Sequence, residues 1–143
     1  MNYRIIPFDE AYRVDIIDLW GKVFEYQDAH NSPELSLQHK LDHSPELLLI
    51  AVEEEELCGA VMGGYDGHRG WIYSLAVAPE YRGQGIGAEL MQAIEDKLTA
   101  QGAVKINLQL IGHNRELVRF YEKLGYMTED RISLGKKIVV KNN

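Results

Sequence analysis

Apolar residues recur along the chain with two periods, and these periods predict an order of strands and helices. Short apolar runs bounded by turn residues predict strands, and apolar residues three or four positions apart predict helices. The predicted order is β-α-α-β-β-β-α-β-α-β-β, an α/β (α+β) fold in which helices flank a mixed sheet. The predicted strands are Tyr3–Phe8, a hairpin of two strands within residues 47–70, Trp71–Pro79, Val104–Leu110 and two closing strands after Tyr126.

Two helices are predicted near the N-terminus. The first covers residues 9–24, with acidic residues in its first turn. The second covers residues 32–46, with Ser32 as its N-cap and Pro33 at its first position, where a missing N–H does no harm. The apolar residues near helical spacing in the first helix are Ala11, Val14, Leu19 and Val23.

The two later helices have clearer apolar faces. The third spans Ile86–Gln101 and ends at Gly102, which can adopt the left-handed conformation. The fourth begins at Asn114 and stops at Gly125. The apolar faces consist of Ile86, Leu90, Ile94 and Leu98 in the third helix and of Leu117, Phe120, Tyr121 and Leu124 in the fourth.

With 143 residues, the chain is expected to form a single domain over residues 1–143. Its apolar runs are too short to span a bilayer, and an acidic pair follows the N-terminus before a signal-peptide core could form. No membrane partner is therefore expected. Cys58 is the single cysteine, which fits a cytoplasmic location and a buried, unreactive thiol.

The formal net charge of −7 arises from 15 Lys and Arg against 22 Asp and Glu. No basic stripe is visible, so nucleic acid is not an expected partner. An acidic surface attracts cationic ligands such as protonated amines. An anionic ligand must instead be held by a local binding site whose positive potential overcomes the overall negative charge.

The segment LAVAPEYRGQGIGAEL contains a candidate anion-binding site, because Gly83, Gly85 and Gly87 lie at the start of the third predicted helix. A helix start presents unpaired N–H groups and partial positive charge, and glycines let phosphate oxygens approach the backbone. Arg82 adds a guanidinium that can fork onto phosphate. The spacing favours a diphosphate ligand, and the simpler alternative is a strand-to-helix turn that needs positive φ.

Two other nucleotide sites fit this segment less well. Gly83, Gly85 and Ala88 match the dinucleotide fingerprint G-x-G-x-x-A, but the next strand ends NLQLIG without the acidic residue that holds a ribose. No G-K-[ST] follows the glycines, which argues against a P-loop. A nicotinamide-binding domain stays open as an alternative.

The segment RGQGIG is similar to the Q/R-x-x-G-x-G/A signature of the GNAT superfamily of acyl-CoA-dependent N-acetyltransferases. SLAVAPEY resembles the fourth strand of that family and its connecting turn, and NRELVRFYEKLGY resembles its N-x-x-x-x-x-F-Y-x-K-x-G-[FY] helix. The resemblance covers nearly the whole chain. It implies a mostly antiparallel central sheet flanked by helices, with splayed fourth and fifth strands.

The resemblance also implies which residues bind acetyl-CoA, the expected cosubstrate, without a metal. Backbone groups of Leu75, Ala76 and Val77 would pair with the pantetheine arm, as an added strand pairs with a sheet edge. Asn114 would steady the cofactor near the splay, although Asn is also a good helix cap. The pyrophosphate would be held by Arg82, Gly83, Gln84, Gly85, Ile86, Gly87 and Ala88.

For catalysis, the resemblance implies that Tyr121 faces the sulfur and donates to the leaving thiolate. Its periodicity alone makes Tyr121 a core aromatic residue beside Phe120. The backbone N–H of Val77 is a candidate oxyanion donor. No general base can be assigned, because the fourth strand, GWIYSLAV, carries no carboxylate. A water chain to a distant carboxylate is one solution, and the candidate side chains are Tyr73, His68, Asp66 and Glu25.

Other chemistry-bearing residues have a structural alternative. His39 and His43 lie four positions apart on the second helix, but no third metal ligand is evident. The segment GGYDGHRG predicts a hairpin turn, whose Asp66 or His68 could also line an acceptor site. An acceptor pocket could be walled by Trp20, Phe24 and Tyr26, and core packing explains Trp20 and Phe24 equally well.

The sequence therefore predicts an N-acetyltransferase that moves an acetyl group from acetyl-CoA to a primary amine by direct attack. The acceptor is a small molecule, a protein N-terminus or a lysine. Cys58 lies far from the motifs in the sequence, so an acyl-enzyme on cysteine is not expected. The alternative is a non-catalytic module of the same fold that binds and senses acyl-CoA, and a homodimer is one assembly that the sequence leaves open.

Overall fold

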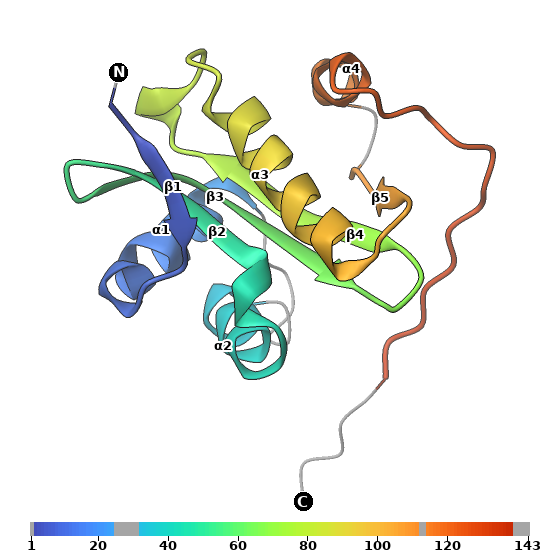
Figure 1. The fold of residues 1–143 in the computed structure, drawn as a ribbon, viewed down its shortest axis with the longest axis horizontal. Coiled ribbons are helices and arrows are strands. Elements are labelled where there is room, and N and C mark those ends of the chain that lie inside the picture. The colour runs from blue at the N-terminus through green and yellow to red at the C-terminus, as the bar shows by residue number, and fades with distance from the viewer. Residues whose placement is uncertain (1, 25–31, 112–113, 139–143) are drawn as a thin grey trace, which may run out of the picture. The chain divides into compact units, whose positions relative to one another are not determined.

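Five strands form one sheet in the order β1-β2-β3-β4-β5 in the computed structural model of the chain, which describes residues 2–24, 32–111 and 114–138 (Figure 1). The first four strands pair antiparallel with their neighbours, and β5 joins β4 in parallel. The expected mixed, mostly antiparallel sheet is therefore confirmed. The strands are β1 (Arg4–Pro7), β2 (Leu48–Glu53), β3 (Glu56–Tyr65), β4 (Gly70–Val77) and β5 (Ile106–Leu108).

The chain divides into two compact units. Met1–Gln109 holds the sheet with the helices α1, α2 and α3, and Leu110–Asn143 holds α4 (Arg115–Lys123). The strand-to-helix connection with the alternating glycines belongs to the first unit. None of the helices in the described ranges is both long and apolar enough to cross a membrane.

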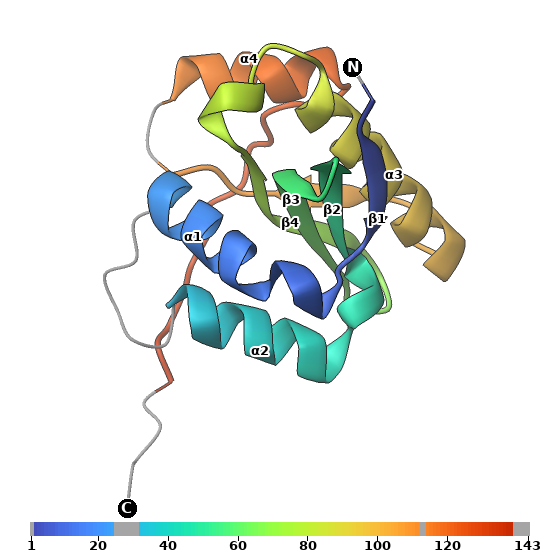
Figure 2. The same cartoon turned by 90° about the vertical axis from the view of Figure 1, so that its left-hand side faces the viewer.

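Helices cover both faces of the sheet (Figure 2). On one face lie α1 (Arg13–Val23) and α2 (Pro33–His43), and on the other lies α3 (Ile86–Gln101). The core beneath α1 and α2 includes Trp20 and Leu37, which are 1% and 0% exposed. The sheet is therefore shielded on both sides within the first unit.

The buried face of α1 differs from the predicted one. Ile16, Leu19 and Trp20 are buried, whereas Val14 is 69% exposed. A 3-10 turn, η1 (Glu10–Tyr12), precedes the helix. Because 3-10 and α turns contain different numbers of residues, this turn shifts the phase of the side chains that follow.

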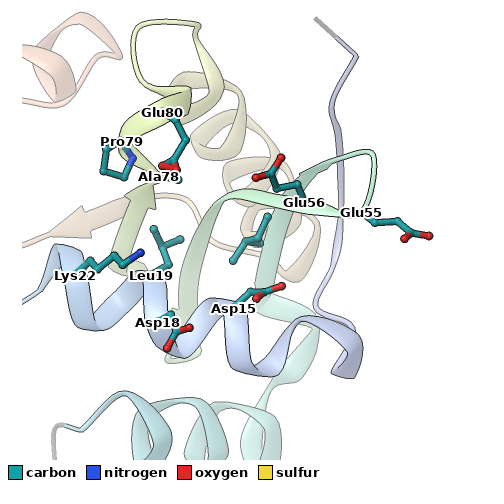
Figure 3. A pocket seen from close by; sticks show the side chains of 10 residues that line it. Asp15, Asp18, Leu19, Lys22, Glu55, Glu56, Ala78, Pro79 and Glu80 are labelled. Atoms are coloured by element: carbon teal, nitrogen blue, oxygen red, sulfur yellow. The ribbon is translucent and has the colours of Figure 1, made fainter.

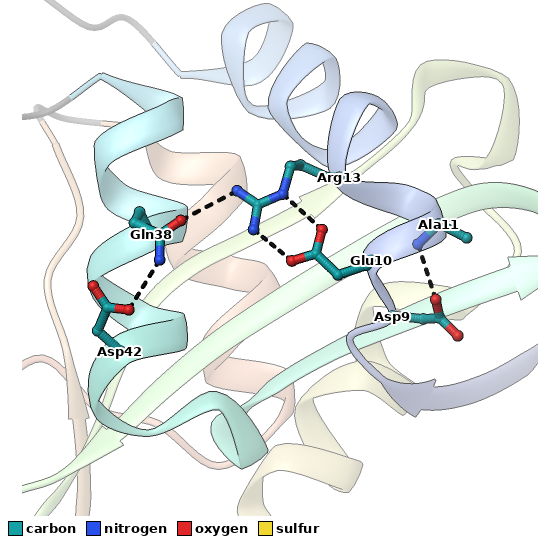
Figure 4. Close-up of polar contacts among 6 residues, drawn as sticks. All are labelled: Asp9, Glu10, Ala11, Arg13, Gln38 and Asp42. Carbon is teal, nitrogen blue, oxygen red and sulfur yellow. Dashed lines mark hydrogen bonds and ion pairs between the residues drawn. The ribbon is translucent and has the colours of Figure 1, made fainter.

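Polar side chains join α1 to α2 at the surface (Figure 4). Arg13 forms an ion pair with Glu10, whose carboxyl pKa it lowers, and donates to Gln38 Oε1 at 3.5 Å. Gln38 in turn donates to Asp42 at 2.9 Å. Exposed contacts of this kind contribute little to stability, so apolar burial is what holds the two helices.

Glycines in the sheet let α3 approach β3 and β4 closely. A Cβ at Gly59 would lie 2.8 Å from the carbonyl oxygen of Ala76, and a Cβ at Gly63 would lie 2.9 Å from Ile94. The helix has the predicted bounds and its predicted apolar stripe is buried. Side chains of this stripe face the glycines one by one: Leu90 at Gly59, Ile94 at Gly63 and Leu98 at Gly70.

A β-bulge interrupts β4 at Tyr73. As β3 advances from Met62 to Gly63, its partner on β4 changes from Ser74 to Ile72, so Tyr73 is an extra residue. Bulges bend a strand and increase its twist. The ladder between β4 and β5 reaches Ile72 and stops there. The bulge therefore marks the point where β4 parts from β5, which is the splay that the family resemblance implies.

The predicted hairpin between β3 and β4 is confirmed. Asp66 Oδ1 accepts hydrogen bonds from the backbone N–H groups of His68 at 2.7 Å and Arg69 at 2.6 Å. Its Oδ2 accepts one from the Trp71 indole N–H at 3.1 Å. The glycine pair at residues 63–64 lies inside β3 and not in the turn.

The described residues of the C-terminal unit form the predicted last helix but neither of the two predicted closing strands. Asn114 caps α4, since its Oδ1 accepts from the Leu117 N–H at 3.1 Å, and Gly125 follows the helix with a φ of 97°. No strand forms in the described residues 126–138. Apolar residues of this segment are exposed, Ile132 at 89% and Leu134 at 92%. Alternating apolar residues form a strand only where a partner strand accepts them.

Gly59→Ala is expected to lower the free energy of unfolding by about 1–3 kcal/mol, because the added Cβ would overlap a backbone oxygen. Gly21→Ala on the exposed side of α1 is the matched control, since nothing lies within 4 Å of its Cβ. Alanine there should stabilise the helix by up to about 1 kcal/mol. Denaturant unfolding measures both differences. A Gly59→Ala protein as stable as the wild type would contradict the close approach described at this position.

Candidate active site

The connection from β4 to α3 contains two glycines in the left-handed conformation. A 3-10 turn, η4 (Pro79–Tyr81), follows β4. Gly83 and Gly85 then have φ values of 79° and 86°, which residues with a side chain rarely adopt. Gly85 is the N-cap of α3, so no side chain caps the first amides of the helix.

The amide groups at the start of α3 are consequently unpaired. The hydrogen bond that begins the helix joins the Glu89 N–H to the Gly85 carbonyl at 3.1 Å. Within the described ranges, the N–H groups of residues 83–88 have no acceptor. No atom lies within 4 Å of a Cβ built at Gly83 or Gly85, so open space adjoins these residues. A helix start of this kind presents partial positive charge to an anion.

Arg82 fastens the glycine turn to the end of β4. Its Nε donates to the Val77 carbonyl at 3.1 Å, and its backbone N–H donates to the Pro79 carbonyl at 3.3 Å. The residue is exposed, so its two Nη groups can still reach an anion. Arg82 therefore has a structural contact that the sequence did not indicate, beside the phosphate contact expected for it.

Two tyrosines engage acidic residues on either side of this connection. The Tyr3 hydroxyl donates to Glu89 in the first turn of α3, and burial together with this carboxylate raises the pKa of Tyr3 to about 12. The Tyr81 hydroxyl donates to Glu56 Oε2 at 2.7 Å and so ties η4 to the start of β3. Both contacts hold the connection without using its unpaired amides.

Beyond the bulge, one edge of β4 is open. The Ala78 N–H donates to the Cys58 carbonyl of β3 at 2.8 Å. Because hydrogen bonding alternates along an antiparallel pair, Ala76 also bonds to β3, while Leu75 and Val77 direct their N–H and C=O groups away from β3. The ladder to β5 ends before the bulge, so no strand of the described chain covers this outer edge.

An acidic pocket of about 290 Å³ lies between α1, the β2–β3 turn and η4 (Figure 3). Asp18 and Lys22 line the pocket from α1, and Ala78 and Pro79 line it from the end of β4 and the start of η4. The pocket was not predictable from the sequence, because three segments distant along the chain form it. Its charged lining consists of Asp15, Asp18, Glu55, Glu56, Glu80 and Lys22.

The structure gives the expected base candidates different surroundings. Hydrogen bonds lower the pKa of the Asp66 carboxyl. The backbone N–H groups of Arg69 and His68 contribute most, and the indole N–H of Trp71 contributes less. His68 is exposed in the same turn, at the far end of β4 from Val77, about 20 Å away by strand rise. Burial of the Tyr73 hydroxyl and the nearby negative charge of Asp66 raise the pKa of Tyr73. This hydroxyl is therefore protonated at neutral pH. Glu25 lies outside the described residues.

Asn114 and Tyr121 both lie in the C-terminal unit. Tyr121 is 6% exposed, and its ring makes edge contacts with Phe120 and Tyr126 at centroid distances of 5.0 Å and 5.8 Å. Burial raises the pKa of the Tyr121 hydroxyl to about 12. The hydroxyl is therefore protonated at neutral pH and can act as a hydrogen-bond donor.

Several other candidate residues lie in the core or at the surface. Cys58 is buried, and desolvation raises the pKa of its thiol, which fits the expected unreactive cysteine. Trp20 lies in the core and Phe24 packs against it, so both belong to core packing. Tyr26 lies outside the described residues. The two histidines of α2 are exposed, and no group of three His, Cys, Asp or Glu side chains suited to a metal occurs in the described part of the chain.

Comparison with known proteins identifies relatives over almost the whole chain. The family described as "Acetyltransferase (GNAT) family" matches residues 13–126. An acetyltransferase of Yersinia pestis (strain Pestoides F) is 46% identical over 140 residues, which cover 98% of this chain and 97% of the relative. An acetyltransferase of Pectobacterium atrosepticum is 44% identical over 139 residues, covering 97% of this chain and 96% of the relative.

Solved structures share the fold. The PaiA N-acetyltransferase from Thermoplasma acidophilum in complex with coenzyme A superposes with a TM-score of 0.78 at 19% identity, covering 92% of this chain and 94% of that one. A chain of the NatC complex bound to Gag peptide and CoA gives a TM-score of 0.81 at 26% identity, covering 92% and 89%. The family match, the relatives named acetyltransferase and the shared fold agree, and the chain therefore belongs to the GNAT family of acetyltransferases and is an acyltransferase enzyme.

Proposed function

We propose that this enzyme moves an acetyl group from acetyl-CoA to a primary amine by direct attack of the amine on the thioester. The observation that carries the proposal is the row of unpaired amides at residues 83–88, which adjoins open space. The family match and the coenzyme A bound to the PaiA neighbour support the same cosubstrate.

The pyrophosphate of coenzyme A binds at the start of α3. The N–H groups of residues 83–88 donate to its oxygens, and the exposed Nη groups of Arg82 pair with its charge. The positive φ of Gly85 supports this role, because a left-handed residue directly before the right-handed Ile86 turns successive amides toward a common side. The anion is thus held by local dipoles against a net charge of −7.

The pantetheine arm extends along the open edge of β4. The outward N–H and C=O of Leu75 pair with the amides of the arm, as in an added strand. The backbone of Ala76, which the resemblance also assigns to the arm, instead bonds to β3, so this part of the expectation is wrong. The Val77 carbonyl is engaged by Arg82 at 3.1 Å, which leaves the Val77 N–H to stabilise the oxyanion of the tetrahedral intermediate.

Tyr121 donates a hydrogen bond to the sulfur as the C–S bond breaks, and Asn114 steadies the cofactor. Both assignments rest on the motif NRELVRFYEKLGY and not on the placement of the C-terminal unit. With a pKa of about 12 for Tyr121, full proton transfer to a thiolate of pKa near 8.5 would be uphill by about 5 kcal/mol. A hydrogen bond that tightens in the transition state is therefore the role that fits this hydroxyl.

The acceptor, whether a small molecule, a protein N-terminus or a lysine, must lose a proton before it attacks. An alkyl ammonium of pKa about 10.4 is neutral in about one molecule in 2,500 at pH 7, a deficit of about 4.6 kcal/mol. Carboxylates around the pocket beside Ala78 attract such a cation and can accept its proton through water. The amine nitrogen then attacks the carbonyl carbon, the C–S bond breaks, and coenzyme A leaves as its thiolate or thiol.

We further propose that residues 1–143 act as one acetyltransferase domain. The family match runs from residue 13 to residue 126 and so crosses the boundary between the two units. The segment assigned to the cofactor phosphates lies in the first unit, and the residue assigned to the leaving group lies in the second. Neither unit alone contains the whole proposed machinery.

Gly85→Ala is expected to weaken coenzyme A binding by about tenfold or more, because a side chain at φ 86° strains the N-cap and turns the amides that face the phosphates. Titration calorimetry with coenzyme A measures the loss. Pantetheine, which lacks the pyrophosphate, should bind the variant and the wild type alike.

Gly102→Ala provides the matched control, since Gly102 has a φ of 111° at the other end of the same helix. This variant should lose stability and keep its affinity for coenzyme A. If Gly85→Ala binds coenzyme A as tightly as the wild type does, the phosphates do not bind at these amides. Binding of NAD in place of coenzyme A would also overturn the proposal.

Tyr121→Phe is expected to lower turnover by at least about tenfold, the effect of losing a hydrogen bond that strengthens in the transition state, with little change in coenzyme A binding. Thiol release from acetyl-CoA with a panel of amines measures the rate. Because the pKa of Tyr121 is about 12, ionisation of this hydroxyl should not reduce wild-type turnover anywhere below about pH 11.

Tyr65→Phe removes a hydroxyl at the end of β3 and serves as the control for Tyr121→Phe. An unaltered rate in Tyr121→Phe would remove this residue from the mechanism. A wild-type protein that binds acetyl-CoA but releases no thiol with any amine of the panel would instead indicate the non-catalytic sensing module.

A further inference from the structure

Lys40 places an ammonium group inside the first unit. It lies on α2 and, at 9% exposure, is the buried charged residue of the described chain. Its Nζ donates to the Gly63 carbonyl oxygen of β3 and, at 2.8 Å, to Ser44 Oγ. The side chain therefore links α2 to a single backbone position of the sheet.

That position, Gly63, faces the bulge of β4. The register passes from the pair Met62–Ser74 to the pair Gly63–Ile72 and leaves Tyr73 unmatched. The Gly63 peptide therefore lies at the step of β3 that is opposite the extra residue. The bulge, in turn, is the point at which β4 leaves β5.

The Gly63 carbonyl has no strand partner on the β2 side. The β2–β3 ladder begins at the pair Leu48–Met62, one residue short of Gly63. The residue before β2, Leu47, donates its N–H to the Ser44 carbonyl at 3.1 Å and so does not serve Gly63. Lys40 supplies the hydrogen bond that a longer β2 would have made.

The opposite face of Gly63 lies against α3. A Cβ at this residue would be 2.9 Å from Ile94 Cγ1 and 3.2 Å from the Trp71 carbonyl oxygen. The backbone at Gly63 therefore packs closely against α3. Helices on both faces of the sheet thus hold this peptide, one through an ammonium group and the other through close packing.

Stability alone does not account for a lysine here. The two bonded partners of Lys40 are neutral, and burial lowers the pKa of its ammonium despite the opposing charge of Glu46. A hydrophobic side chain of similar length would avoid the cost of desolvating a charge and could hold α2 on the sheet equally well. What a hydrophobic side chain could not do is fix the direction of the Gly63 carbonyl.

We propose that Lys40 is a positioning residue for the acetyl transfer, which fixes the Gly63 peptide and thereby keeps β4 bulged and parted from β5. The catalytic consequence rests on the proposed function, since the open edge beyond the bulge is where the pantetheine arm is placed. The conformational consequence rests only on the contacts of the unliganded protein. Lys40 itself acts through Gly63 and not on the substrate.

The experiment compares Lys40→Met, which keeps the length of the side chain and removes the donor, with Lys40→Arg, which keeps a charged donor. Amide hydrogen exchange at Tyr73 and Ser74 in the unliganded protein reports the bulge. The ratio kcat/KM for acetyl-CoA reports the transfer. Lys40→Leu, which also removes the donor, replaces Lys40→Met in the same comparison if Lys40→Met does not fold.

Two controls separate positioning from general stability. Lys97→Met makes the same chemical change at an exposed position of α3. Leu41→Ala loosens the packing of α2, where Leu41 is partly buried against the core, without touching Gly63. Melting temperatures of all variants show how much stability each has lost.

We expect Lys40→Met to exchange faster at Tyr73 and Ser74 and to lose at least about tenfold in kcat/KM. A loss of about tenfold corresponds to one hydrogen bond to a charged group. Lys40→Arg should restore both properties to within about threefold. Unchanged exchange, or equal effects in Leu41→Ala at the same melting temperature, would overturn the positioning role. If the wild type neither binds nor consumes acetyl-CoA, the proposed function fails while the exchange data still decide the role of Lys40.

Discussion

The structure depends on one constraint, which is that β4 must leave β5 before β4 itself ends. Up to Ile72 the strand is paired on both sides, and after the extra residue Tyr73 it continues with one side open. Pairing to the end would have used the outward groups of Leu75 and Val77, and no further chain could be added there. The open edge runs directly into the turn whose amides are unpaired. A cosubstrate with an amide-bearing arm and a diphosphate therefore meets both features along one continuous segment.

The start of α3 could be predicted from the sequence because its determinants are local. The glycines, the apolar stripe and the terminating Gly102 all act within a turn or two of the residues they affect. The bulge at Tyr73 could not be predicted, since it depends on the register between two strands, and an alternating pattern does not show where one residue is extra. The phase of α1 was missed for a similar reason, because the short turn η1 precedes it and places Val14 at the surface.

The alternating apolar residues after Tyr126 predicted strands that the described residues do not form. The segment after Tyr126 has the pattern of strands, yet its described residues 126–138 form no strand, because a strand is completed by hydrogen bonds that a neighbour supplies. Lys40 shows the reverse case, a local signal that could have been read. It lies three positions after the buried Leu37, on the face of α2 that turns toward the core. A charged residue at such a position needs a buried partner, and only the fold shows that the partner is the carbonyl of Gly63.

The connection from β4 to α3 separates a site for negative charge from a site for positive charge. An acidic protein can hold an anion only with a field that acts over a short distance, and the start of α3 provides one that fades within about one helical turn. Glu89, in the first turn of α3, and Glu56, at the acidic pocket, are each engaged by a tyrosine hydroxyl. On the other side of η4, the carboxylates of the acidic pocket act on cations over a distance comparable to the Debye length of about 8 Å. One short turn therefore separates a surface that suits phosphate from a surface that suits an ammonium ion, which is the arrangement that a transfer from a phosphate-bearing carrier to an amine requires.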